Sequence, residues 1–101
     1  MTVISARIIQ PTIGKTAVAL QRARDAADIM ARHGAKVRVN NIAAGDGAGS
    51  IVVLSAYPDF ATTARVFESY QKDPDFQKLL QERELDPAGT MVGPLVARTV
   101  Y

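Results

Sequence analysis

The sequence predicts an α+β domain in which one antiparallel four-stranded sheet is covered on one face by helices. Three observations support this prediction. A glycine-rich turn at residues 44–49 separates two strand-like segments, 37–42 and 50–57. The second of them contains an apolar run at residues 51–54, and a run without alternation is typical of a strand covered on both faces. The predicted order is strand, helix, strand, strand, helix, strand, which is the split βαβ or ferredoxin-like arrangement.

Composition limits the chain to a single ordinary globular domain. Its 101 residues are 48% apolar and 22% charged, which is enough for one hydrophobic core. There is no cysteine, so disulfides, thiolate metal sites and cysteine nucleophiles are excluded. The net charge of +2 comes from dispersed basic residues, and no long apolar segment or leader-like pattern is seen. We therefore expect a cytoplasmic protein that has neither nucleic acid nor membrane as a partner.

The first strand and the first helix are predicted from their different periodicities. Residues 2–10 alternate as a strand, with Ile4, Ala6 and Ile8 on a fully apolar face. Pro11 ends this strand, and Thr12 is the predicted N-cap of a helix at residues 13–32. The apolar positions of that helix recur every three or four residues, and they are Ile13, Ala17, Leu20, Ala23, Ala27 and Met30.

The end of the first helix and the following hairpin are marked by local signals. His33 and Gly34 end the helix, because glycine adopts the left-handed conformation that follows many helices. In the strand at residues 37–42, Asn41 shares a face with two valines while Ile42 falls on the polar face. This mismatch predicts a β-bulge at Asn40 and Asn41.

The second half of the chain contains a broken helix and a final strand. Asp59 is the predicted cap of a helix that begins at Phe60. The helix breaks at residues 72–74 and restarts with Asp73 as cap and Pro74 at its first position. After a turn at residues 86–89, residues 95–101 are predicted to form the last strand, with an irregular start at residues 93–94.

One sheet face is left uncovered if both helical segments pack on the other. The face predicted to be uncovered carries the apolar residues Val3, Ile9, Ile51, Val53, Tyr57, Val96 and Val100. A soluble monomer rarely exposes such a large apolar patch. We therefore expect a homodimer that packs sheet against sheet around a two-fold axis.

Two segments carry a resemblance to a known group of proteins. These are PTIGK at residues 11–15, before the first helix, and DPDFQKLL at residues 73–80, after the second. Together with the element order, they resemble the dimeric α+β barrel superfamily, nearest to its NIPSNAP-like and antibiotic-biosynthesis-monooxygenase-like members. The resemblance covers nearly the whole chain. It implies a ferredoxin-like fold that forms a dimeric α+β barrel and binds a ligand between its helices and sheet.

The resemblance to this superfamily does not imply one particular reaction. The superfamily includes cofactor-independent monooxygenases, haem-degrading monooxygenases, isomerases and proteins without known activity, and function belongs to sites rather than folds. The haem-degrading members use asparagine, tryptophan and histidine. This chain lacks tryptophan, and its only histidine ends the first helix, which argues against haem degradation. We therefore expect no cofactor.

Three polar residues are candidates for catalysis. His33 is a candidate proton-transfer residue, and the alternative is a helix C-cap. Asn41 is a candidate pocket amide on an apolar face, and the alternative is a structural asparagine at the bulge. Tyr70, like Tyr57, is a candidate hydroxyl donor to a phenolic or quinone-like ligand.

Arginines and aromatic residues are the candidate ligand-binding residues. Three arginines are predicted to project from the mixed sheet face, where they would bind an anionic ligand, form interface ion pairs or lie in solvent; they are Arg7, Arg38 and Arg98. The aromatic candidates line the predicted cleft or simply form core, and they are Tyr57, Phe60, Phe67, Tyr70 and Phe76.

Several other classes of site are not supported by the sequence. The glycines at 45, 47 and 49 join two strands rather than opening a helix, so they do not form a dinucleotide or phosphate loop. No cluster of histidine and carboxylate residues indicates a metal site, and no nucleophile elbow accompanies the Ser, His and Asp residues. Two hypotheses remain: a cofactor-independent monooxygenase or isomerase acting on an aromatic or polyketide-like molecule, and a non-catalytic binding or structural homodimer.

Overall fold

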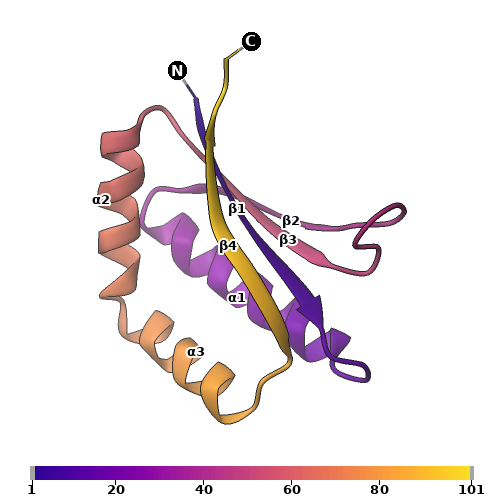
Figure 1. Ribbon diagram of the computed structural model, residues 1–101. Helices are drawn as coiled ribbons and strands as arrows, with labels where there is room; N and C mark the ends of the chain where they lie inside the picture. The colour runs from indigo at the N-terminus through magenta and orange to yellow at the C-terminus, as the bar shows by residue number, and fades with distance from the viewer. Residues whose placement is uncertain (1, 101) are drawn as a thin grey trace.

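The computed structural model describes residues 2–100 and has the predicted α+β architecture. Its elements are β1 (Val3–Pro11), α1 (Thr16–Arg32), β2 (Lys36–Asn41), β3 (Ile51–Tyr57), α2 (Phe60–Gln71), α3 (Pro74–Leu85) and β4 (Gly89–Arg98). The strands form one antiparallel sheet in the order β2-β3-β1-β4. Figure 1 shows the three helices on one side of this sheet, with the loop between β2 and β3 projecting away from them. The predicted ferredoxin-like fold is thus confirmed.

The predicted assignment of the two sheet faces was wrong. On β3, burial alternates strictly, and Ile51, Val53 and Tyr57 are at most 4% exposed in the single chain. These residues therefore lie beneath the helices, as does Val3 of β1, which is paired with Tyr57. Both faces of the central strands are apolar, so the sequence did not reveal which one the helices cover.

The uncovered side, which we call the open sheet face, carries the alternate residues of each strand. Residues paired across antiparallel strands share a face, so the strand register identifies this set. Its apolar members are Ile4, Ala6 and Ile8 of β1, Val52, Leu54 and Ala56 of β3, and Val92, Leu95 and Ala97 of β4. Lys36, Arg38 and Asn40 of β2 complete it. The patch of apolar side chains is real, but it is made of different residues from those predicted. Val100, which was also assigned to the patch, follows the end of β4.

The last strand is longer than predicted and begins at Gly89. It includes residues 93–94, which the prediction had placed before the strand. The strand can include these two residues because the β1–β4 register shifts between Ala6 and Ile8. As a result, Gly93 and Pro94 both lie opposite Arg7. The predicted bulge at Asn40 and Asn41 is absent from β2, whose register with β3 is regular. Tyr101, predicted to end this strand, lies outside the described residues.

Helix α1 begins three residues later than predicted. A tight turn, in which the Lys15 amide donates to the Thr12 carbonyl at 2.9 Å, precedes it, so Thr12 is not its cap. Ile13 is fully exposed. The buried side of the helix carries Ala19, Ala23, Ile29 and Met30, and Ala17 is exposed. The apolar stripe predicted for this helix therefore had the correct period, but only some of its residues lie on the buried side.

The two later helices begin where capping predicted. Asp59 Oδ1 accepts a hydrogen bond from the Thr62 amide at 2.6 Å, and Asp73 Oδ1 accepts one from the Asp75 amide at 2.9 Å. Gly34 has φ of 102° and follows α1, as expected for a helix end. No helix within residues 2–100 has the length and apolar character needed to cross a membrane.

Candidate functional site

A cleft of about 840 Å³ lies between α1, α3 and the β1–β4 side of the sheet. We call it the helix-side cleft. Most of its wall is apolar, and small side chains on α1 leave room for an occupant. The apolar lining includes Ala19, Ala23, Ala26 and Met30 from α1, and Phe76, Leu79 and Leu80 from α3. A largely apolar concavity with a few polar groups is the usual form of a small-molecule site.

Arg7 is the polar group at the sheet wall of this cleft. Its Nη2 donates to the Tyr70 hydroxyl oxygen at 2.5 Å, and its Nη1 lies 3.9 Å from the Met30 sulfur. Its guanidinium also lies over the rings of Phe67 and Tyr70, 5.5 and 5.6 Å from their centroids. Since each of these partners is packed in the core or against it, Arg7 is held in one orientation.

An aromatic chain runs from the core to the cleft. Ring centroids are 5.8 Å apart for Tyr57 and Phe67, 5.7 Å for Phe67 and Tyr70, and 5.0 Å for Tyr70 and Phe76, all edge-on. Of these residues, Phe76 lines the cleft. Phe60 stands apart at the start of α2, where it is 47% exposed. Four of the five predicted aromatic residues thus form one group that packs in or against the core and contacts Arg7, and Phe60 is not part of it.

The hydroxyl group of Tyr57 is buried away from the cleft. It has no hydrogen-bond partner among residues 2–100. Burial raises the pKa of this phenol above its ordinary value. Tyr57 does not belong to the lining of the helix-side cleft.

The three arginines predicted on one mixed face do not share a face. Arg7 pairs with Val53 and Arg98 with Val3, so both lie on the helix side of the sheet. Arg38 pairs with Leu54 and lies on the open sheet face. Of the three, Arg7 lines the helix-side cleft. Arg7 and Arg98 thus share a face as predicted, and Arg38 was assigned wrongly because the alternation within β2 does not reveal its register with β3.

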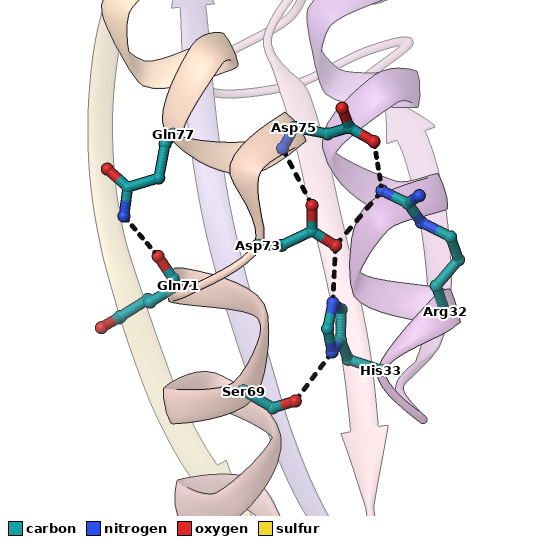
Figure 2. Close-up of polar contacts among 7 residues, drawn as sticks. All are labelled: Arg32, His33, Ser69, Gln71, Asp73, Asp75 and Gln77. Atoms are coloured by element: carbon teal, nitrogen blue, oxygen red, sulfur yellow. Dashed lines mark hydrogen bonds and ion pairs between the residues drawn. The ribbon is translucent and has the colours of Figure 1, made fainter.

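His33 joins the ends of three helices. Its Nδ1 lies 2.7 Å from Ser69 Oγ of α2, and its Nε2 lies 2.7 Å from Asp73 Oδ2 at the start of α3. Figure 2 shows the imidazole between these two groups, and Arg32 contacts the same Asp73 oxygen, Oδ2, at 3.3 Å. The bond from His33 is the main reason that the pKa of Asp73 is lowered, followed by the bond from the Asp75 amide.

The Ser69, His33 and Asp73 contacts have the connectivity of a hydrolase triad, but their surroundings differ from those of one. Asp73 already caps α3 and pairs with Arg32. None of Ser69, His33 and Asp73 lines the helix-side cleft. The contacts connect the ends of the three helices, and His33 also occupies the C-cap position of α1, which is the alternative that the sequence left open.

Asn41 lies at the loop end of β2. Its side-chain amide makes long contacts of 3.4 Å to the carbonyl oxygens of Gly49 and Ser50, which close the glycine-rich loop. Asn41 is exposed and does not line the helix-side cleft. Its position agrees with a structural role at the hairpin.

Two arginines that sequence reasoning missed also line the cleft. Arg22 of α1 is only 15% exposed and bonds to Asp86, with 2.5 Å to its carbonyl oxygen. Arg83 of α3 donates to the Met91 sulfur at 3.4 Å. A signal for Arg83 was present, since it lies seven residues after Phe76 and continues the stripe of Phe76, Leu79 and Leu80.

Comparison with known proteins shows which solved structures share this fold. No protein-family model and no curated protein sequence matches the chain. Solved structures do match. A NIPSNAP domain protein from Burkholderia xenovorans aligns with a TM-score of 0.69 and 22% identity, over 92% of this chain and 94% of its own. A NIPSNAP-like domain protein from the same organism has a TM-score of 0.76 and 16% identity, over 98% of this chain and 85% of its own.

An enzyme shares the same architecture. A mutant of SnoaB, a cofactor-independent oxygenase from Streptomyces nogalater, aligns with a TM-score of 0.68 and 18% identity over 99% of this chain and 94% of its own. At such identities the likeness extends to the fold and not to the reaction. The chain therefore has the ferredoxin-like α+β fold that the NIPSNAP proteins and this oxygenase share, which confirms, at the level of fold, the resemblance read from the sequence.

Proposed function

We propose that this protein binds a small, largely apolar molecule in the helix-side cleft. The observation that carries the proposal is the cleft itself: about 840 Å³ with alanines on one wall and Phe76, Leu79 and Leu80 on the other. Ligand sites of drug-sized molecules have volumes in this range. The Arg7 guanidinium, which is held in one orientation by its bond to the Tyr70 hydroxyl, is a polar group at the sheet wall of this cleft.

Binding of a neutral fluorescent probe tests this proposal. N-phenyl-1-naphthylamine should bind with a blue-shifted, enhanced emission that saturates at one probe per chain. Ala26→Leu fills part of the cleft and should weaken binding at least fivefold. Ala27→Leu makes the same substitution at a neighbouring helical position that does not line the cleft, so it should leave binding unchanged. Equal binding by all three proteins would contradict the proposal.

We also propose that the functional unit is a homodimer joined through the open sheet face. Nine apolar side chains from three strands form this face, and Ile4, Val92 and Leu95 are 38%, 57% and 54% exposed. A continuous apolar patch of this kind is unusual for a monomer. A second copy is the simplest cover, because a two-fold axis matches the patch with itself.

A second candidate function is cofactor-independent oxygenation of an aromatic or polyketide-like substrate. The observation that favours it is the shared fold with SnoaB, at 18% identity. In such a reaction a substrate carbanion adds dioxygen to form a peroxide, and loss of water leaves a carbonyl carbon. Arg7, supported by Tyr70, would stabilise the anionic form of the substrate, since both groups of this pair are fixed. His33 and Asn41 lie outside the cleft, so they are no longer proposed as base or donor.

Oxygen uptake distinguishes the two candidate functions. A panel of anthrone and hydroxyquinone substrates should consume dioxygen with the wild-type protein if it is an oxygenase. Arg7→Gln should then lower kcat at least tenfold, because anion stabilisation is lost. If no member of the panel consumes oxygen while the fluorescent probe still binds, the non-catalytic binding function is supported.

A further inference from the structure

Three arginine side chains from three different elements meet at the helix-side cleft. Arg7 comes from β1, Arg22 from α1 and Arg83 from α3, and all three belong to its lining. They are 15 or more residues apart in sequence, so the fold alone brings them together. None is fully solvated: Arg22 is 15% exposed at its side chain, and the other two are partly buried.

The charges of Arg7 and Arg83 are not neutralised within the described chain. The Arg7 guanidinium contacts the Tyr70 hydroxyl and the Met30 sulfur, which are both neutral. Arg83 contacts the Met91 sulfur. Among residues 2–100, Arg22 alone of the three forms an ion pair, with Asp86. Partly buried guanidinium groups normally have anionic or several hydrogen-bonding partners.

The three cations are close enough to influence one another. Burial lowers the pKa of Arg83, and the charges of Arg7 and then Arg22 lower it further. The acidic groups at hand do not balance them. Asp86 is shared between Lys15 and Arg22, and Glu84 lines the cleft without an ion pair to Arg7 or Arg83. The cleft therefore carries a local excess of positive charge over an apolar floor.

An arginine that is held in place binds an anion without losing much freedom. Arg7 is fixed by Tyr70 and by two aromatic rings, and its side chain belongs to the lining of the cleft. Arginine presents planar pairs of N–H donors that match a carboxylate or an enolate. The remaining surface, from α1 alanines to Phe76 and Leu79, suits a hydrocarbon body.

We propose that the ligand of the helix-side cleft is an apolar organic acid, whose carboxylate or enolate group binds Arg7 and Arg83 while its aromatic or aliphatic body packs between α1 and α3. This inference rests on the proposed function, because it names the chemical class of the molecule that the cleft binds. It also assigns Arg83 as a binding residue that determines specificity.

A matched pair of ligands tests this inference. Naphthalene-2-carboxylate and naphthalene-2-carboxamide have the same body and nearly the same shape, and each is titrated against bound N-phenyl-1-naphthylamine. The carboxylate should displace the probe at a concentration at least tenfold lower than the amide. Arg83→Gln and, independently, Arg7→Gln should reduce this preference to threefold or less, while the affinity for the amide changes little.

Arg24→Gln is the matched control variant. Arg24 lies on the exposed side of α1 and outside the cleft lining, so the substitution changes net charge equally without touching the site. It should keep the full preference for the carboxylate. Equal binding of the carboxylate and the amide by the wild-type protein would overturn the inference. Loss of the preference for the carboxylate in both Arg24→Gln and Arg83→Gln would overturn it too. In either case the cleft would still bind ligands. Failure of the probe itself to bind overturns the proposed function instead.

Discussion

Two buried tyrosines have opposite hydrogen-bonding situations. Tyr70 is fully buried, and its hydroxyl oxygen accepts a bond from Arg7. Tyr57 is 3% exposed, and its hydroxyl has no partner within the described residues. A buried polar group without a partner costs its full desolvation energy, whereas a paired one does not. The same chemical change should therefore have opposite effects at the two positions.

Tyr57→Phe should stabilise the protein by about 1 kcal/mol, because it removes a desolvated hydroxyl and keeps the ring that contacts Phe67. Tyr70→Phe should destabilise it by roughly 1–2 kcal/mol, because an Arg7 donor loses its acceptor. Urea denaturation followed by circular dichroism measures both free energies of unfolding. A loss of stability in Tyr57→Phe would mean that its hydroxyl has a partner after all.

Site residues were predictable where they share a stripe with core residues. Phe76 lies on the apolar stripe of its helix and was expected to line a cleft or form core. Arg7 was expected on the sheet face away from the helices, whereas it lines the helix-side cleft. Arg22 was missed because a charged residue beside an apolar stripe usually faces solvent, whereas here it lines the cleft together with Ala19 and Ala23. His33 was recognised as chemically special, but its partners Ser69 and Asp73 come together through tertiary packing that local patterns do not encode.

At the scale of elements, the ends of α1, α2 and α3 are tied by one polar junction. His33 bridges Ser69 and Asp73, and Arg32 pairs with both Asp73 and Asp75 (Figure 2). Asp73 is 12% exposed at its side chain. The folded state therefore favours the ionised carboxylate, and stability depends on pH through this group.

Acidification should weaken the fold through Asp73. Its pKa is lower in the folded state than the ordinary 3.8, so the folded protein binds fewer protons than the unfolded chain. The stability that ionised Asp73 contributes to the folded protein is fully present at neutral pH. It is lost as the pH falls from about 4 through the folded-state pKa of Asp73. Asp73→Asn should be less stable at pH 7 and should lose less stability between pH 5 and pH 2.5.

Thermal denaturation over this pH range measures the effect, and Asp46→Asn in the exposed loop controls for the loss of one carboxylate. Asp59 and Asp86 also have lowered pKa values, so some acid sensitivity should remain in Asp73→Asn. Parallel pH profiles for wild type and Asp73→Asn would show that the junction does not favour the ionised group.

The β1–β4 pairing depends on the absence of a side chain at residue 93. Gly93 has φ of 116°, and a Cβ atom there would lie 2.7 Å from the Ala6 carbonyl oxygen. The bulge opposite Arg7 therefore requires glycine at position 93. Gly14 also has a positive φ, of 84°, but nothing lies within 4 Å of a Cβ built on it.

Gly93→Ala should cost at least about 2 kcal/mol of stability, because backbone strain and a clash with fixed backbone atoms add together. Gly14→Ala introduces backbone strain without a clash, so it should lower the free energy of unfolding by about 1 kcal/mol. Chemical denaturation of both variants gives the comparison. Equal costs would mean that the β1–β4 bulge relaxes to accommodate a methyl group.

Element types were largely predictable because periodicity, capping residues and prolines are local signals. Asp59, Asp73 and Pro74 placed two helix starts correctly. The extent of β4 was not predictable, since Gly93 and Pro94 normally interrupt strands and are tolerated here because they form a bulge in β4 opposite Arg7. The choice of covered sheet face was also hidden, because apolar residues occur on both faces of β1 and β3 and even Ser5 and Ser55 are buried beneath the helices.

At the scale of the whole molecule, the two surfaces that carry the proposals lie on opposite sides of the sheet. The cleft is formed on the helix side, and the open sheet face looks away from the helices (Figure 1). Arg7 and Leu54 illustrate the separation: they sit on adjacent strands but point to opposite faces. A change that breaks the proposed homodimer should therefore leave ligand binding by each chain largely intact.

If the proposed homodimer forms through the open sheet face, Leu54→Asp should convert it into a folded monomer. Leu54 lies at the centre of the open sheet face, between Ala6 of β1 and Arg38 of β2, so a carboxylate there would be desolvated in a sheet-to-sheet contact. In the monomer the same carboxylate faces water beside Arg38, an opposite-charge cross-strand pair, which keeps the variant folded. Light scattering after size exclusion should give twice the 10.8 kDa chain mass for wild type and the single-chain mass for Leu54→Asp.

Val18→Asp places the same charge on a 40% exposed apolar residue of α1, outside the open sheet face, and should remain dimeric. N-phenyl-1-naphthylamine should bind all three proteins with similar affinity, because the cleft is formed within one chain. A wild-type protein that is monomeric at tens of micromolar would contradict the homodimer. Loss of probe binding in a folded, monomeric Leu54→Asp would show instead that the partner chain completes the cleft, which would join the two surfaces into one site.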